Sequence, residues 1–182
     1  MRFRFLIIAL LFVLPGLAQE KQEKMSWDEN RPLTWEDFKG EAPKDRAYKF
    51  QANSSTGIAY DWYYGHKNGE PILRYSVTSN FYPNLSWVRN PEDKVYLLAH
   101  EQLHFDISEL HARKLRKAMD EYEIGRNIRR DLLRLYNTIE KERQEMQKAF
   151  DVETHNGMYK DVESRWRNFI AEELKKLEQY KN

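Results

Sequence analysis

The sequence predicts an α+β fold in which a small antiparallel sheet is followed by a buried metal-binding helix and two further long helices. Three observations support this class. Residues 57–64 and 72–81 have the composition of strands, and a His-Glu-x-x-His motif lies in the apolar run 95–110. Two later stretches then carry apolar residues at helical spacing. Because the strands come first and the helices follow, we expect the two kinds of element to be segregated, as in α+β domains.

The first half of the chain predicts a hairpin or a small antiparallel sheet. Residues 57–64 and 72–81 are rich in aromatic and β-branched side chains, and turn-forming residues separate them at 65–71. Upstream, residues 33–38 fit either a short helix or a short strand. In both cases we expect the two aromatic side chains of this segment to pack on the sheet.

The His-Glu-x-x-His motif lies on a predicted helix with a clear start. Residues 90–93 supply an N-cap, a proline at the first helical position and acidic residues for the first turn. The helix is expected to run to about Glu123 and to stop at Gly125. Its apolar residues cover most of its circumference, which predicts that it is buried. Burying polar side chains on such a helix costs free energy, and binding of a metal ion offsets that cost.

Two amphipathic helices are predicted after this one. The second carries apolar residues at Ile128, Leu132, Leu135, Ile139, Met146 and Phe150. The third carries Val162, Trp166, Phe169, Ile170, Leu174 and Leu177, and Asn156-Gly157 marks the junction between the two. We interpret both as packing elements with solvated charged faces.

The motif itself predicts part of a catalytic zinc site. His100 and His104 are four residues apart, so on a helix both imidazoles can reach a single metal ion. Glu101 is then placed to accept a proton from a water molecule on that metal. A catalytic zinc takes three protein ligands and keeps a fourth position for water. The cofactor predicted is therefore Zn²⁺, with one ligand still to be found.

The third ligand is expected from a later element. His111 shares a helical face with His104 but lies roughly 10 Å further along the axis, and no helix breaker separates them. His155 is the first choice, because it stands at the end of the second helix, which an antiparallel hairpin returns to the metal. Asp151 and Glu153 in the same segment remain alternatives, each of which can instead be a capping or solvated acid.

The N-terminus has the pattern of a secretory signal. Arg2 and Arg4 precede an apolar stretch and a small-residue site, which predicts a signal peptide over 1–18 and a mature chain from Gln19. An uncleaved anchor is the alternative, although the apolar stretch is too short for a stable membrane span. A polar lead, 19–32, and one domain, 33–182, follow. We expect a secreted or periplasmic protein without a stable membrane anchor.

Charge and cysteine content exclude several classes of protein. The chain carries a formal charge of +1, which becomes −1 when Arg2 and Arg4 leave with the signal peptide. This gives no basic surplus for nucleic acid or anionic lipid. The absence of cysteine excludes disulfides and a lipid anchor. The partner expected is a peptide or protein substrate.

The chain resembles a bacterial domain-of-unknown-function family described as predicted secreted zinc-dependent proteases. The matching residues lie at 33–40, 81–87, 100–110, 112–113, 150–154 and Trp166. The resemblance implies a zincin-like metallopeptidase. One departure concerns the third ligand, because the family pattern has a His directly before the Gly at the end of the Asp-x-Glu-Thr segment. Here Asn156 precedes Gly157, and His155 lies one residue earlier.

The sequence therefore predicts an exported zinc metallopeptidase with His100, His104 and His155 as metal ligands and Glu101 as general base. By analogy with zincins, an extended peptide is expected to pair with the sheet edge near residues 74–79. The alternatives are a non-catalytic zinc-binding or protein-binding module of the cell envelope and a zinc hydrolase that does not cleave peptides.

Overall fold

The structure is a computed structural model that describes residues 22–45, 50–90 and 95–182. The predicted signal peptide and residues 91–93 of the predicted helix start lie outside this range. The elements, in chain order, are β1 (Met25–Ser26), the 3-10 turn η1 (Trp35–Asp37), β2 (Ala52–Asn53), β3 (Thr56–Lys67), β4 (Glu70–Phe81), η2 (Pro83–Leu85), β5 (Trp87–Val88), α1 (Val95–Asp120), α2 (Ile128–Thr154), α3 (Lys160–Lys176) and η3 (Glu178–Tyr180).

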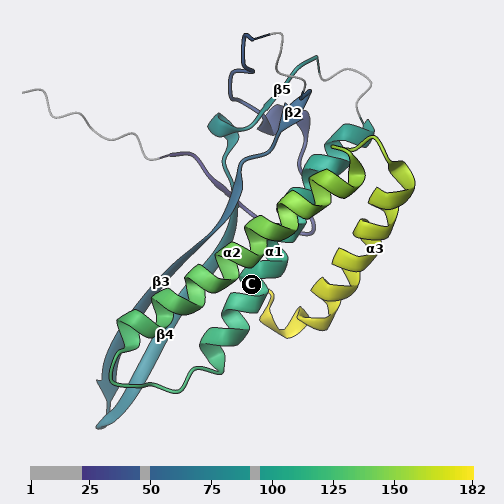
Figure 1. Ribbon diagram of the computed structural model, residues 1–182. Coiled ribbons are helices and arrows are strands. Elements are labelled where there is room, and N and C mark those ends of the chain that lie inside the picture. The colour runs from purple at the N-terminus through teal and green to yellow at the C-terminus, as the bar shows by residue number, and fades with distance from the viewer. Residues whose placement is uncertain (1–21, 46–49, 91–94) are drawn as a thin grey trace, which may run out of the picture.

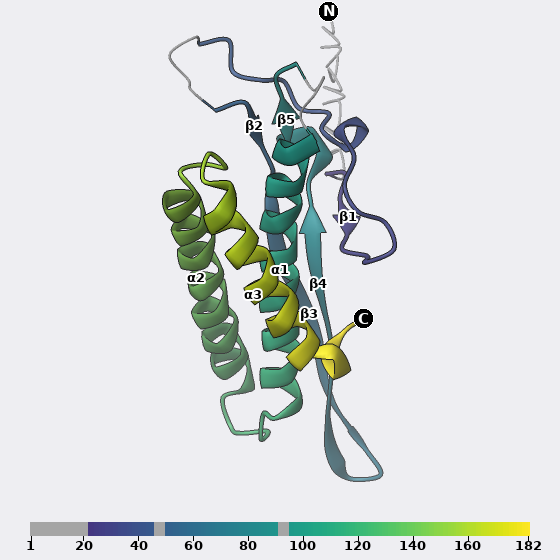
Figure 2. The same cartoon turned by 90° about the vertical axis from the view of Figure 1, so that its right-hand side faces the viewer.

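This architecture confirms the predicted α+β class, with the sheet before three long helices. Helix α1 lies between the β3–β4 hairpin and the pair formed by α2 and α3 (Figure 2). Its buried side chains form one core with the hairpin and α2, and another with α2 and α3. The central position of α1 explains the apolar run around its circumference.

The predicted hairpin is confirmed, and its turn is shorter than residues 65–71. Lys67 pairs with Glu70, so Asn68 and Gly69 alone connect the antiparallel strands (Figure 1). Both have positive φ, 54° and 87°, which an Asn-Gly pair adopts in a two-residue hairpin turn. The flanking residues therefore continue the strands.

Segment 33–38 contains the 3-10 turn η1 and no strand, which decides between the two predicted options. Phe38 is buried and meets the ring of Phe81 at the end of β4, with centroids 5.1 Å apart. Within the predicted polar lead, Met25 and Ser26 form β1 beside β4. The structure thus packs part of that lead against the sheet.

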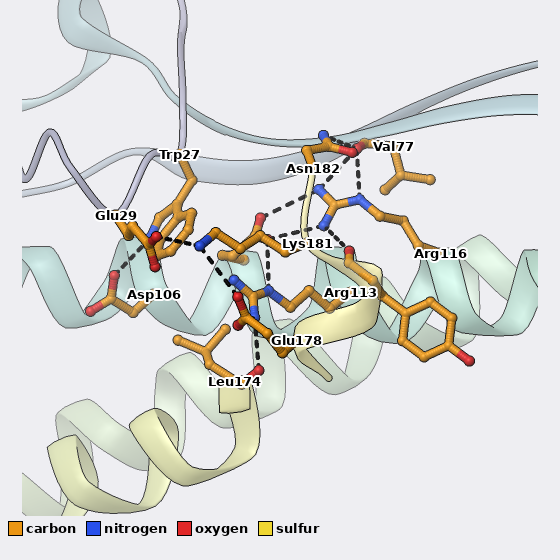
Figure 3. Close-up of polar contacts among 12 residues, drawn as sticks. Trp27, Glu29, Val77, Asp106, Arg113, Arg116, Leu174, Glu178, Lys181 and Asn182 are labelled. Carbon is orange, nitrogen blue, oxygen red and sulfur yellow. Dashed lines mark hydrogen bonds and ion pairs between the residues drawn. The ribbon is translucent and has the colours of Figure 1, made fainter. Parts of the chain in front are cut away.

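The C-terminal residues are tied to α1 by two buried arginines (Figure 3). Arg113 donates to the carbonyl of Leu174 at 2.7 Å and to Glu178 at 3.0 Å. Arg116 donates to the carbonyls of Val77 and Tyr180. The last turn of the chain therefore closes over the end of α1 remote from the His-Glu-x-x-His motif.

Candidate metal centre

The two motif histidines lie on the first turns of α1 and share one face of it. Their ring centroids are 5.0 Å apart. Phe150 of α2 packs against both rings, at 4.5 Å from His100 and 5.0 Å from His104. Because α1 is held against α2 by this contact, both imidazoles have little freedom to turn.

Each histidine has a fixed acceptor at its Nδ1 atom. His100 Nδ1 lies 3.2 Å from Oε2 of Glu163, and His104 Nδ1 contacts Oε1 of Gln147. The amide of Gln147 is oriented by its other end, since its Nε2 donates to the carbonyl of His104 at 2.7 Å. Both Nδ1 atoms therefore act as donors, which leaves the Nε2 lone pairs of the neutral rings as acceptors.

The two Nε2 atoms face one carboxylate oxygen. Asp151 Oδ1 lies 3.4 Å from Nε2 of His100 and 3.0 Å from Nε2 of His104. When both rings are neutral, three acceptors face one another, and this arrangement needs a proton or a metal cation between them. The three atoms lie within 4.8 Å of one another.

The donor set fits zinc. Ligand atoms about 2.0–2.2 Å from a tetrahedral zinc are separated by roughly 3.4 Å, and both distances to Asp151 are near that value. Two imidazole nitrogens and one carboxylate oxygen are ligands that zinc accepts in catalytic sites. His100, His104 and Asp151 are the residues that would hold the ion.

The electrostatics of the cluster also favour a cation. Burial lowers the pKa of His100, but Asp151, Glu163 and the charge of Glu101 outweigh it and raise that pKa to about 9. Burial raises the pKa of Asp151, but hydrogen bonds from the two histidines hold it below its usual range. The group therefore attracts positive charge at the atoms that would bind a metal.

Glu101 lies beside these ligands and remains available for chemistry. Its side chain is buried and lines the same cavity as the two histidines. Among the described residues, none donates a hydrogen bond to its carboxylate, although Ser54 donates to its backbone carbonyl. A buried carboxylate without a protein donor is suited to bind and deprotonate a water molecule.

The cavity is large enough for several residues of a peptide. Its volume is about 1030 Å³. One wall is the extended segment that contains β2, and the other walls come from α1, α2 and the turn after α2. The lining residues are Phe50, Gln51, Ala52, Asn53, Ser54, Ser55, Thr56, Leu97, His100, Glu101, His104, Arg143, Gln147, Asp151, His155, Asn156 and Met158.

The structure places Asp151 where His155 was expected. Helix α2 ends at Thr154, and His155 caps it in the left-handed region with φ 51° and ψ 49°. Its ring stacks on Tyr159 at 5.4 Å, so His155 lines the cavity but lies outside the ligand group. Asp151 is one helical turn earlier, on the face of α2 that meets α1, which accounts for the difference.

The other candidates lie outside the ligand group. Glu153 is exposed and accepts a hydrogen bond from Trp166 Nε1 at 2.9 Å, so its carboxylate is directed to α3. His111 is buried and its Nδ1 donates to the carbonyl of Ile107 at 2.8 Å. The exclusion of His111 agrees with its distance along an unbroken helix.

The expected peptide edge near residues 74–79 is already used within the fold. The carbonyl of Val77 accepts from Arg116 and Asn182, and the carbonyl of Ser79 accepts from the backbone of Trp27. Because those acceptors are occupied, this edge is a poor site for an added strand. The cavity is bounded instead by the segment around β2.

Sequence reasoning missed Gln147 and Glu163, which orient the two histidines. They are 43 and 63 residues from their partners, and each stands among other polar residues on an amphipathic helix. No spacing rule connects them to the motif. Only the packing of α2 and α3 on α1 brings them to the Nδ1 atoms.

Comparison with known protein families finds a match to part of the chain. Residues 92–158 match a family described as a bacterial protein of unknown function (DUF922). The match covers α1, α2 and the turn after it, including His100, Glu101, His104 and Asp151. It supports the resemblance to a bacterial family of unknown function, while that description carries no activity. No curated protein matches the chain, and no solved structure does.

None of the helices in the described residues is long and apolar enough to cross a membrane.

Proposed function

We propose that the protein is an exported zinc-dependent peptidase that hydrolyses peptide bonds. The observation that carries this proposal is the meeting of three donor atoms, from His100, His104 and Asp151, beside the buried carboxylate of Glu101 in one open cavity. A bound zinc supplies Lewis acidity, which lowers the pKa of a water molecule and polarises a scissile carbonyl.

The side chains of the site transfer protons and orient the metal ligands. Glu101 accepts a proton from the attacking water while the water oxygen bonds to the carbonyl carbon. Glu101 then delivers a proton to the departing amine as the carbon–nitrogen bond breaks. Glu163 and Gln147 hold the two histidines with Nε2 directed to Asp151. This arrangement fixes the ligand atoms before the substrate arrives.

The shape of the cavity favours a peptide. Strand β2 pairs with β5 and has no second strand neighbour among the described residues. Ala52 and Asn53 of β2 line the cavity. An extended peptide lying along this segment can make backbone hydrogen bonds, as in strand addition to a sheet edge. Its scissile bond would then lie near Glu101.

Zinc analysis and a peptide-library digest of the mature protein test the proposal. We expect about one zinc per chain and cleavage that stops when the metal is chelated. Glu101→Gln should keep the zinc and lower the rate at least a hundredfold, because the amide preserves shape but cannot accept the proton. Glu142→Gln, at an exposed site on α2, removes the same charge and should leave the rate unchanged.

Two outcomes would contradict the peptidase proposal. If Glu101→Gln cleaved as fast as the parent protein, the general-base mechanism would be wrong. If the protein bound zinc firmly and cut no peptide in a broad library, the non-catalytic binding module would replace it.

A further inference from the structure

We infer that Glu163, on α3, is a positioning residue that orients His100 for metal binding and completes the site from outside the matched family region. This inference rests on the proposed function, because it assigns a role toward the same metal. Residues 92–158 end before α3 begins at Lys160. A helix that the family match does not cover therefore contributes to the centre.

Glu163 is a buried anion whose hydrogen-bond partners hold its carboxylate in place. The residue is fully buried. Its Oε2 atom accepts a hydrogen bond from Tyr96 Oη at 2.6 Å and lies 3.2 Å from His100 Nδ1, and its Oε1 atom contacts Arg167. A buried carboxylate is costly unless such donors surround it. The neighbouring groups thus hold Glu163 charged and fixed against His100.

An ionised carboxylate determines which nitrogen of His100 carries the proton. Because it only accepts hydrogen bonds, it selects the ring form with hydrogen on Nδ1 and a lone pair on Nε2. That Nε2 atom is the one that faces Asp151 at 3.4 Å. The negative charge also makes the ring a stronger donor to a cation.

The turn between α2 and α3 supports this assignment independently. Gly157 has a φ of +83°, and a Cβ atom there would lie 3.3 Å from Nδ1 of His100 and 3.7 Å from Oε2 of Glu163. The backbone of the turn therefore passes directly over the contact between the two side chains. A glycine at this position permits both the backbone conformation and the close approach.

The two histidines are supported differently. His104 has the neutral amide of Gln147 at its Nδ1, whereas His100 has a carboxylate. An amide oxygen can therefore orient a ligand in this same site without charge. This difference predicts a graded series at position 163, in which Gln keeps the acceptor and Ala removes it.

Zinc affinity, measured by competition with a chelating dye, tests the inference. Glu163→Gln should weaken zinc binding about tenfold and Glu163→Ala about a hundredfold, the range found when such outer partners of metal ligands are removed. Asp161→Asn is the matched control, since it removes the same charge from an exposed site in the first turn of α3. It should change affinity less than threefold.

A second readout separates orientation from general folding. Nitrogen NMR of the metal-free protein, at a pH above the pKa of His100 where the ring is neutral, reports which ring nitrogen of His100 carries the proton. In the parent protein we expect the Nδ1 proton to be present, and in Glu163→Ala this preference should be lost while urea unfolding remains cooperative. The cobalt-substituted protein should likewise show an altered visible spectrum in Glu163→Ala and an unchanged one in Asp161→Asn.

The outcomes distinguish this inference from the proposed function. If the parent protein bound zinc and cleaved peptides while Glu163→Ala bound zinc as tightly and kept the same His100 ring form, Glu163 would have no positioning role and the peptidase proposal would stand. If the parent protein bound no zinc at its histidine pair, both proposals would fall.

Discussion

The histidine excluded from the metal site, His111, gives the most quantitative prediction. Its ring is buried, its Nδ1 donates to the carbonyl of Ile107, and its Nε2 has no hydrogen-bond partner among the described residues. The pKa of His111 is lowered to about 4, and burial is the largest cause. The hydrogen bond to the Ile107 carbonyl acts in the opposite direction, and the charges of Lys114 and Arg143 lower the pKa further. The folded protein therefore keeps this ring neutral.

The sign of the pH effect follows from linkage. The pKa of His111 is lower in the folded state than the ordinary value of 6.5, so the unfolded state binds more protons between about pH 6.5 and 4. The contribution of the neutral His111 ring to the free energy of unfolding is fully present above pH 6.5 and is lost as the pH falls toward 4. At about 1.4 kcal/mol per pKa unit, the full loss is roughly 3 kcal/mol, of which about 2 kcal/mol falls between pH 7.5 and 5.

The assay compares urea unfolding of the metal-free parent with His111→Leu at those two pH values. Leucine fills a similar volume and cannot be protonated, so the stability difference between the two proteins should shift by about 2 kcal/mol in favour of the variant at pH 5. His66→Leu, at an exposed site on the hairpin, controls for the loss of an imidazole. An equal difference at both pH values would show that the fold does not hold the His111 ring neutral.

Three further predictions follow from the fold and the sequence. Gly157→Ala should lower stability by about 1–3 kcal/mol and weaken zinc binding. Gly69→Ala, with a similar φ of +87° but open space around it, should lower stability alone. Equal loss of zinc binding in both variants would contradict the crowding at His100. Removal of residues 178–182 should cost about 2–4 kcal/mol in urea unfolding, because the buried Arg113 and Arg116 lose hydrogen-bond partners there, and an unchanged midpoint would count against this. N-terminal sequencing of protein from the envelope or medium should begin at Gln19, and full-length chain in the cytoplasm would exclude the predicted export.

The elements of the fold were predictable because local pattern determines them. The hairpin follows from two β-prone stretches, and Asn68-Gly69 at positive φ set its turn. The helices follow from apolar residues at helical spacing. Their exact ends were less predictable, since α1 stops at Asp120 and not near Glu123. Helix ends depend on local capping and on tertiary contacts that periodicity does not report.

The candidate site was predictable only where its residues share one helix. His100, Glu101 and His104 are related by helical spacing, which the sequence displays directly. The choice between Asp151 and His155 depends on which face of α2 meets α1 and on where α2 ends. Glu163 depends on how α3 returns along α1, which no local pattern encodes. The position of His155 at the end of the second helix favoured it in the sequence, whereas the packing of α2 on α1 favours Asp151.

The central claim is that His100, His104 and Asp151 bind one zinc ion beside Glu101. The most direct measurement is the anomalous scattering of zinc in crystals of the mature protein. We expect a single strong peak about 2.0–2.2 Å from Nε2 of both histidines and from a carboxylate oxygen of Asp151. A peak held by His155 in place of Asp151, or no peak at the histidine pair in zinc-saturated crystals, would contradict it.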